Sequence, residues 1–153
     1  MASIVDSGAI NSVAPPSVSS VPLAESKGSL SGMQFHTADG TRIPNLGQKT
    51  LATVSEEGAP IRQTFQIAEI SRPLASVVEL ADAGNVVVFG RKGGYVYNVE
   101  SRRRLDFSRE HGVYLLRTWT QEPSNDQTNS TFARQGWVRL AARPVRMDCV
   151  WRG

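Results

Sequence analysis

One short motif near the start of the chain has residue types that could do chemistry. Asp6-Ser7-Gly8 directly follows Ala2-Ser3-Ile4-Val5, a short segment whose β-branched residues predict a strand. Gly8 allows a tight turn, so we expect the carboxylate of Asp6 to project from a strand end. Chance alone produces Asp-Ser/Thr-Gly in roughly one chain of this size in fifteen, and an ordinary strand-to-turn transition is therefore the alternative interpretation.

Composition limits the classes of function. The 153 residues are 40% hydrophobic, enough for one modest core, and the formal net charge of +3 is too small to predict a nucleic-acid surface. The single cysteine, Cys149, and two histidines, His36 and His111, fall short of a zinc cluster or disulfide framework, so we expect no metal and no cofactor. No apolar run approaches the roughly 18 residues that span a membrane, and residues 1–20 contain no secretory signal. We therefore expect a soluble cytoplasmic (intracellular) protein.

The hydrophobic pattern predicts a mostly-β chain. Residues 33–38 alternate apolar with polar side chains, and residues 41–46 are expected to form the returning strand. This pattern predicts a hairpin with Asp39-Gly40 at its tip. Residues 49–54 and 61–70 predict a second strand pair around a Gly/Pro turn. The remaining expected strands are residues 85–89, 95–99, 105–108 and 113–119.

A single segment has helical periodicity. Residues 73–84 predict one short helix that begins at Pro73 and ends at Gly84. Its expected core face consists of Leu74, Val77, Val78 and either Leu80 or Ala81. The near-continuous apolar run at residues 85–89 is typical of a strand buried on both faces, and Gly93-Gly94 predicts the turn after it.

The end of the chain differs from the rest. Residues 121–131 are almost entirely polar and have no periodicity, so we expect residues 120–153 to form a flexible, dispensable tail. Arg102-Arg103-Arg104 is interpreted as a solvated turn, with nucleic-acid contact as the alternative. The expected organisation is residues 1–90 as one domain, 91–119 as additional strands, and 120–153 as the tail.

The order of these features resembles the retropepsin-like aspartic proteases of copia-type retroelements. The resemblance covers roughly residues 2–90 and consists of Asp6-Ser7-Gly8-Ala9, the hairpin with Ala38-Asp39-Gly40 at its tip, the paired strands of residues 47–70, and the segment from Arg72 to Phe89. Residues 94–116 resemble the segment that follows the protease in copia-type polyproteins. The resemblance implies a closed, barrel-like β half of the acid-protease type with one short helix, followed by extra hairpin strands.

The resemblance also implies roles for individual residues. Asp6 is expected to be the catalytic carboxylate, with Ser7, Gly8 and Ala9 forming the active-site turn. Ala38, Asp39 and Gly40 are expected to lie in a flap over the substrate, and Leu74, Ala75 and Ser76 beneath the active site. The chain departs from the family pattern at Ser76, where retroviral members have glycine, and before Asp6, where the family usually has an extra strand.

Aspartic protease chemistry needs two carboxylates that share one proton around a bound water. The sequence contains one Asp-Ser/Thr-Gly motif, so the implied enzyme is a homodimer with one Asp6 from each subunit. The implied function is an endopeptidase that processes a retroelement polyprotein, with a polypeptide substrate and neither membrane nor nucleic acid as partner. The alternatives are a catalytically inactive pepsin-like remnant that serves as a binding or dimerisation module, favoured by the short N-terminus, and a fragment without stable function.

Overall fold

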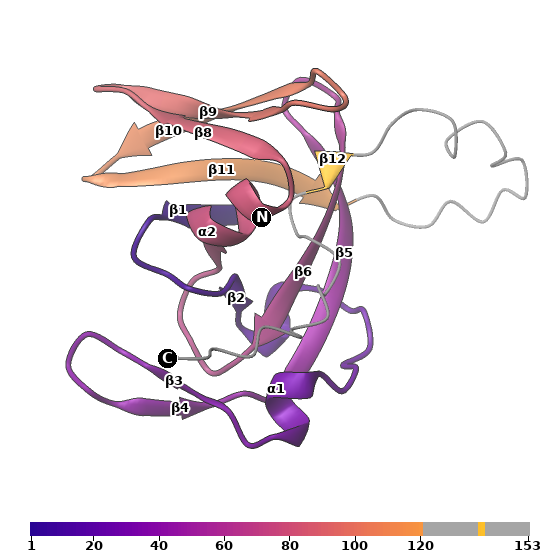
Figure 1. Cartoon of the computed structure of the whole chain (residues 1–153), viewed down its shortest axis with the longest axis vertical. Helices are drawn as coiled ribbons and strands as arrows, with labels where there is room; N and C mark the ends of the chain where they lie inside the picture. Colours follow the sequence, from indigo (N-terminus) through magenta and orange to yellow (C-terminus); the bar gives the residue numbers. More distant parts are fainter. Residues whose placement is uncertain (121–137, 140–153) are drawn as a thin grey trace, which may run out of the picture.

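A computed structural model of the chain describes residues 1–120 and 138–139, and nearly all of its regular structure is β (Figure 1). The elements up to residue 67 are β1 (Ala2–Asp6), β2 (Val13–Ala14), the 3-10 helix η1 (Pro16–Val18), α1 (Lys27–Leu30), β3 (Gln34–His36), β4 (Arg42–Pro44), β5 (Gly47–Ser55) and β6 (Pro60–Ile67). The later elements are β7 (Leu74–Ser76), α2 (Val77–Asp82), β8 (Asn85–Phe89), β9 (Gly93–Asn98), β10 (Arg104–Glu110), β11 (Val113–Thr120) and β12 (Val138–Arg139). The expectation of a mostly-β fold is confirmed.

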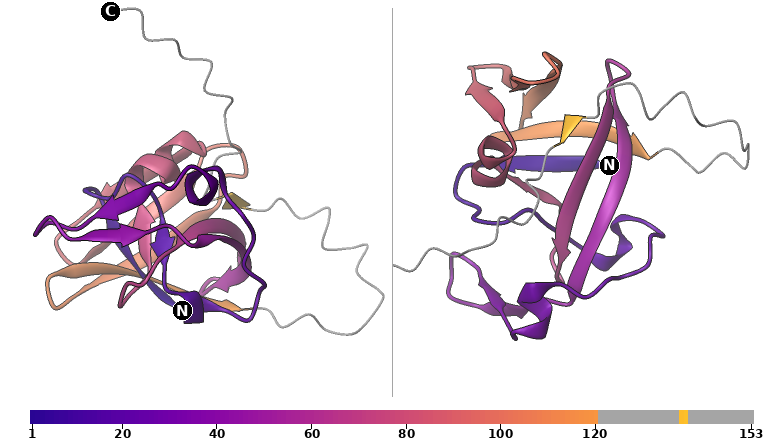
Figure 2. Two further views of the ribbon diagram at one scale, coloured as in Figure 1. Left: turned by 90° about the horizontal axis from the view of Figure 1, so that it is seen from below. Right: turned by 45° about the vertical axis from the view of Figure 1, so that its right-hand side comes forward.

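Six strands form a closed ring of pairings. β1 pairs with β7 in parallel and with β11 in antiparallel orientation, and β2, β6 and β5 connect β7 back to β11. The long β5–β6 hairpin crosses the β1–β11 pair at a steep angle (Figure 2), as the strands of a small closed sheet must tilt to close it. β10, β9 and β8 extend from β11 as an antiparallel meander, while β3 and β4 form a separate two-stranded sheet.

Two clusters of buried side chains fill the fold. The larger consists of Val5, Ala59, Ile61, Leu80, Val96, Leu105, Phe107 and Leu116. The smaller consists of Ala14, Leu51, Phe65 and Ile67. The larger cluster takes side chains from β1, β6, α2, β9, β10 and β11, so the strands expected as an addition after residue 90 share one sheet and one core with residues 1–90.

The helical prediction was partly wrong. Leu74–Ser76 form a strand instead of the first helical turn, because their backbone pairs with β1. The helix begins at Val77 with Ser76 as its N-cap, and Gly84, whose φ is +83°, follows its end as predicted. Leu80 is fully buried, but Val78 is 48% exposed and does not belong to the core. A second helix, α1, was not expected; it is held by reciprocal hydrogen bonds between Ser26 and Ser29.

Two predictions about β8 and β9 were also wrong. β8 is not buried on both faces, because Val86 is 49% and Phe89 39% exposed. β8 is also the edge of the meander and pairs with β9 alone within the described residues. Gly93-Gly94 is not the turn but the start of β9, where a Cβ on Gly94 would lie 2.0 Å from the Val88 carbonyl oxygen. The glycines are needed for close approach of neighbouring strands.

The expected tail falls largely outside the described residues. Within it, Val138–Arg139 pair in parallel with Ile61 and Arg62 of β6. Arg102 does lie in a turn, with a φ of 57°, while Arg104 begins β10. None of the helices in the described part of the chain is long and apolar enough to cross a membrane.

Candidate active site at the end of strand β1

The parallel pairing of β1 with β7 brings two predicted groups of site residues together. Asp6 lies opposite Ser76, and Val5 lies opposite Ala75. Ile4 lies opposite Leu74 in the same register. Because parallel strands end at the same edge of a sheet, Asp6 emerges beside the start of α2.

The turn after β1 fixes the carboxylate of Asp6. The Gly8 amide donates a 2.8 Å hydrogen bond to Asp6 Oδ1, while Oδ2 has no hydrogen-bond partner within residues 1–120. A Cβ on Gly8 would lie 3.3 Å from Oδ1, so glycine serves here by leaving room for the carboxylate. Ser7 is exposed, and Ala9 is half-buried. One oxygen of a partly exposed carboxylate therefore remains available for chemistry.

Ser76 ties the active-site turn to the rest of the fold. Its side chain is fully buried, and its hydroxyl lies 2.6 Å from the Ala9 carbonyl oxygen and 3.1 Å from that of Ile10. The same oxygen accepts a hydrogen bond from the Glu79 amide at the start of α2. Glycine, which retroviral members of the family have at this position, could make none of these side-chain contacts.

Glu79 holds the next part of the same loop, at Asn11 and Ser12. Its carboxylate accepts hydrogen bonds from the Ser12 amide at 2.9 Å and from the Asn11 side chain at 3.1 Å. The Ser76 amide in turn donates to the Ser12 hydroxyl at 3.0 Å. Ser76 and Glu79 therefore anchor residues 9–12, which directly follow the Asp6-Ser7-Gly8 turn.

We predict that Ser76→Ala lowers the free energy of unfolding by about 2 kcal/mol, since it removes a helix N-cap and the hydroxyl that bonds the loop carbonyl groups of Ala9 and Ile10. Urea denaturation of both proteins measures the difference. Ser71→Ala, at an exposed position in the loop before β7, is the matched control and should change stability by less than about 0.5 kcal/mol. Equal stability of Ser76→Ala and the wild type would contradict the anchoring role.

The expected flap residues lie on the β3–β4 hairpin, and the hairpin tip itself is confirmed. Ala38, Asp39 and Gly40 are exposed, and Gly40 has a φ of +84°. The hydroxyl of Thr37 and the amide of Thr41 donate to Asp39 Oδ1, and these bonds lower the pKa of Asp39 to about 2. The hairpin points to the same side of the molecule as the end of β1 (Figure 1). No hydrogen bond joins these tip residues to Asp6 within the described chain.

An open depression of about 430 Å³ lies beside Asp6. Its floor and walls come from the end of β1, the end of β8 and the β10–β11 turn. The lining residues are Ile4, Val5, Asp6, Ser7, Phe89, Gly112, Val113 and Tyr114. The flap residues are not among them, nor are Leu74, Ala75 and Ser76. Asp6 thus opens onto a largely apolar surface.

No protein-family model, curated protein or solved structure matches this chain.

The sequence did not identify Phe89, Gly112, Val113 and Tyr114 as site residues. One local signal, the His111-Gly112 pair, was available for the turn that precedes Val113 and Tyr114. His111 and Gly112 both have positive φ, of 49° and 83°, as a two-residue hairpin connection requires. The position of this turn beside Asp6, in contrast, depends on the pairing of β11 with β1.

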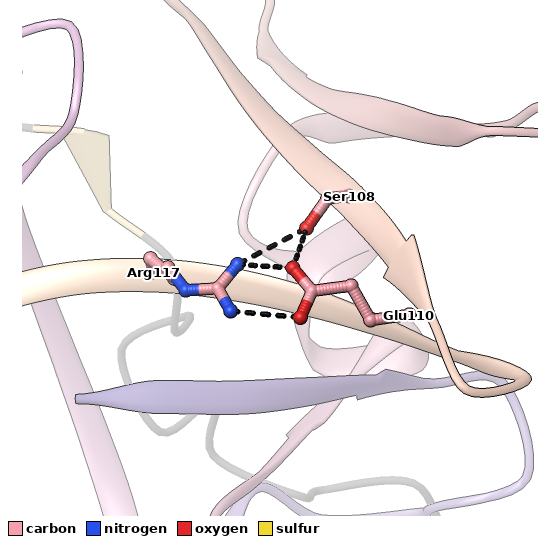
Figure 3. Close-up of polar contacts among 3 residues, drawn as sticks. All are labelled: Ser108, Glu110 and Arg117. Carbon is pink, nitrogen blue, oxygen red and sulfur yellow. Dashed lines mark hydrogen bonds and ion pairs between the residues drawn. The ribbon is translucent and has the colours of Figure 1, made fainter.

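A polar cluster fixes the β10–β11 hairpin that forms one wall of the depression (Figure 3). Arg117 donates to both carboxylate oxygens of Glu110, at 2.9 Å from Nη2 to Oε2, and the Ser108 hydroxyl donates to Oε1 at 2.8 Å. The hydrogen bonds from Arg117 and Ser108 lower the pKa of Glu110 from 4.5 to about 2. Glu110 is therefore ionised at any mildly acidic pH.

This cluster predicts a pH dependence of stability. Because folding lowers the pKa of Glu110, the cluster stabilises the fold above about pH 4.5 and loses this effect as the pH falls towards 2. Glu110→Gln should therefore lower the urea midpoint slightly at pH 6 and make little difference at pH 2. The effect is small because both side chains are exposed. A larger difference at pH 2 than at pH 6 would contradict the assignment.

Proposed function

We propose that the protein is a retropepsin-like aspartic endopeptidase of the copia type, which acts as a homodimer on a retroelement polyprotein inside the cell. The observation that carries the proposal is the register of β1 against β7, which sets Asp6 opposite Ser76 at the start of α2. The flap-like hairpin on the same side and the open depression beside Asp6 support it.

The proposed chemistry follows from a pair of carboxylates. Two Asp6 side chains, one from each subunit, would hold a water and share one proton. One carboxylate takes a proton from the water as the water attacks the scissile carbonyl, and the other, which is protonated, donates a hydrogen bond to that carbonyl oxygen. The first carboxyl group then gives its proton to the amide nitrogen as the C–N bond breaks and the amine leaves. In such a dimer, Ser7, which is exposed next to Asp6, would hydrogen-bond across the two-fold axis and hold both turns.

The proposal predicts that specific activity depends on protein concentration. Cleavage of an unfolded protein substrate per molecule of enzyme should fall on a thousand-fold dilution, because the dimer dissociates into subunits with one Asp6 each. The control is a single chain with two copies of the sequence joined by a flexible linker, whose activity per molecule should not change on dilution. Activity of the unlinked protein that stays constant over this range would contradict the shared site. A protein that binds peptides without cleaving them, linked or unlinked, would instead be the inactive binding module.

A further inference from the structure

The depression beside Asp6 has an aromatic wall. Phe89 of β8 packs against Tyr114 of β11 with ring centroids 4.8 Å apart, and both contact Phe107 of β10, at 5.5 and 5.7 Å. Phe107 is buried, but Phe89 is 39% exposed at the surface of the depression. Val113 and Ile4 extend the same apolar surface towards Asp6. An exposed aromatic group beside a carboxylate provides a surface on which an apolar side chain can bury its area.

Three cationic side chains lie next to this aromatic wall. Arg91 and Lys92 follow Phe89 in the β8–β9 turn, after Gly90, whose carbonyl oxygen accepts a 3.0 Å hydrogen bond from the Tyr114 hydroxyl. Arg109 lies opposite Tyr114 in the sheet, and its guanidinium carbon is 5.8 Å from the centre of the Tyr114 ring. Arg109 also donates to the Arg91 carbonyl oxygen, and its amide donates to that of Lys92. The cations and the aromatic wall therefore form one continuous surface.

None of these three residues forms an ion pair within residues 1–120. The ion pairs among residues 1–120 join Arg104 to Asp106 and Arg117 to Glu110, and neither pair includes Arg91, Lys92 or Arg109. All three are exposed. The three cations do not line the depression, but Arg109 lies beside the Tyr114 ring. An acidic group of a bound chain that passes over Tyr114 would therefore meet them.

We propose that this surface, formed by Phe89, Tyr114, Arg91, Lys92 and Arg109, is a substrate subsite. It takes an aromatic or large aliphatic side chain of the polypeptide against Phe89 and Tyr114, and an acidic residue within two positions of it against the cations. The subsite names the preferred substrate of the proposed endopeptidase and so rests on that function. The volume of about 430 Å³ accommodates one large side chain and the adjoining backbone.

Binding to the Asp6→Asn protein tests the subsite without cleavage. Three fluorescein-labelled peptides differ at two positions: one has Phe followed by Glu, one has Ala followed by Glu, and one has Phe followed by Lys. Fluorescence polarisation gives each dissociation constant. We expect the Ala peptide to bind at least about tenfold more weakly than the Phe-Glu peptide, from lost apolar burial. The Lys peptide should bind about fivefold more weakly.

Charge reversal on the protein tests the cations directly. Arg109→Glu in the Asp6→Asn background should remove the preference for the Glu peptide over the Lys peptide, and Lys92→Glu should reduce it. Arg72→Glu is the matched control, because Arg72 is exposed in the loop before β7 and does not belong to the surface formed with Phe89 and Tyr114. Retained preference in Arg109→Glu, equal loss in Arg72→Glu, or equal binding of all three peptides would overturn the subsite.

Cleavage of the same peptides by the wild-type protein separates the subsite from the proposed function. Selective binding without cleavage would support the subsite and contradict the endopeptidase. Cleavage of all three peptides at one rate, together with equal binding, would overturn the subsite and leave the endopeptidase standing.

Discussion

Replacing Asp6 by asparagine is expected to lower cleavage by at least about a thousand-fold while the protein stays folded, because an amide can neither share the proton of the carboxylate pair nor accept one from water. The substitution keeps the shape of the turn, since the Asn side-chain oxygen can still accept the Gly8 hydrogen bond that Asp6 Oδ1 accepts now. The unfolding free energy should therefore change by no more than about 0.5 kcal/mol. Peptide hydrolysis and urea denaturation measure the two quantities on the same preparation.

Mixing the wild-type and Asp6→Asn proteins is a more direct test of the shared site than assaying each alone. Because each mixed dimer has one working carboxylate, excess Asp6→Asn protein should inhibit the wild type at concentrations where dimers exchange. Asp82→Asn, an exposed acid-to-amide change at the end of α2, is the matched control and should neither lose activity nor inhibit. Activity retained in Asp6→Asn, or wild-type activity that the excess variant leaves unchanged, would rule out the dyad.

The second large effect is expected when the strands after β8 are removed. We expect a protein consisting of residues 1–90 to lack cooperative folding. Without β11, both β1 and β5 lose an antiparallel partner. The larger core cluster also loses Val96, Leu105, Phe107 and Leu116. At about 1.5–3 kcal/mol for each buried side chain, this loss of roughly 6–12 kcal/mol equals the whole stability of an ordinary domain.

Thermal unfolding followed by circular dichroism tests this expectation. A protein consisting of residues 1–120 is the control, because it keeps β11 and omits the expected tail, and it should retain a sharp transition. A cooperative transition in the 1–90 protein would show that the protease-like segment is independent of the strands that follow it. Loss of folding in the 1–120 protein would contradict the dispensability of the tail.

Local patterns in the sequence were sufficient for part of the fold. Alternating side chains located β5 and β6, and Asp39-Gly40 located the tip of the β3–β4 hairpin, because turn residues and strand periodicity are properties of adjacent residues. The prediction of helix at Leu74–Ser76 was wrong for the opposite reason. Their apolar spacing matches a helix, but the backbone hydrogen bonds that make them a strand come from β1, about 70 residues earlier. Such long-range pairing has no local signal.

The candidate site, too, could be predicted from the sequence only in part. Asp6 and Leu74–Ser76 were identified from their order along the chain, and their register across β1 and β7 brings them together. The aromatic wall could not be predicted, because Phe89 and Tyr114 meet only when β8 and β11 occupy opposite ends of the β8–β11 meander. Ser76 was noted as a departure from glycine, while its contacts with Ala9 and Ile10 depend on the path of the loop.

The closure of the ring by β11 has a consequence for the time at which the site forms during synthesis. The amino group of Met1 donates to the Thr118 carbonyl oxygen, a contact between residues 117 positions apart, and the Thr118 amide donates back to Met1. Contacts at such separation form late and slow folding. On the ribosome, the strand that ends in Asp6 emerges first but waits for β11 before its sheet is complete. A nascent chain therefore carries Asp6 on an incomplete ring of strands until almost all of the described sequence has been made.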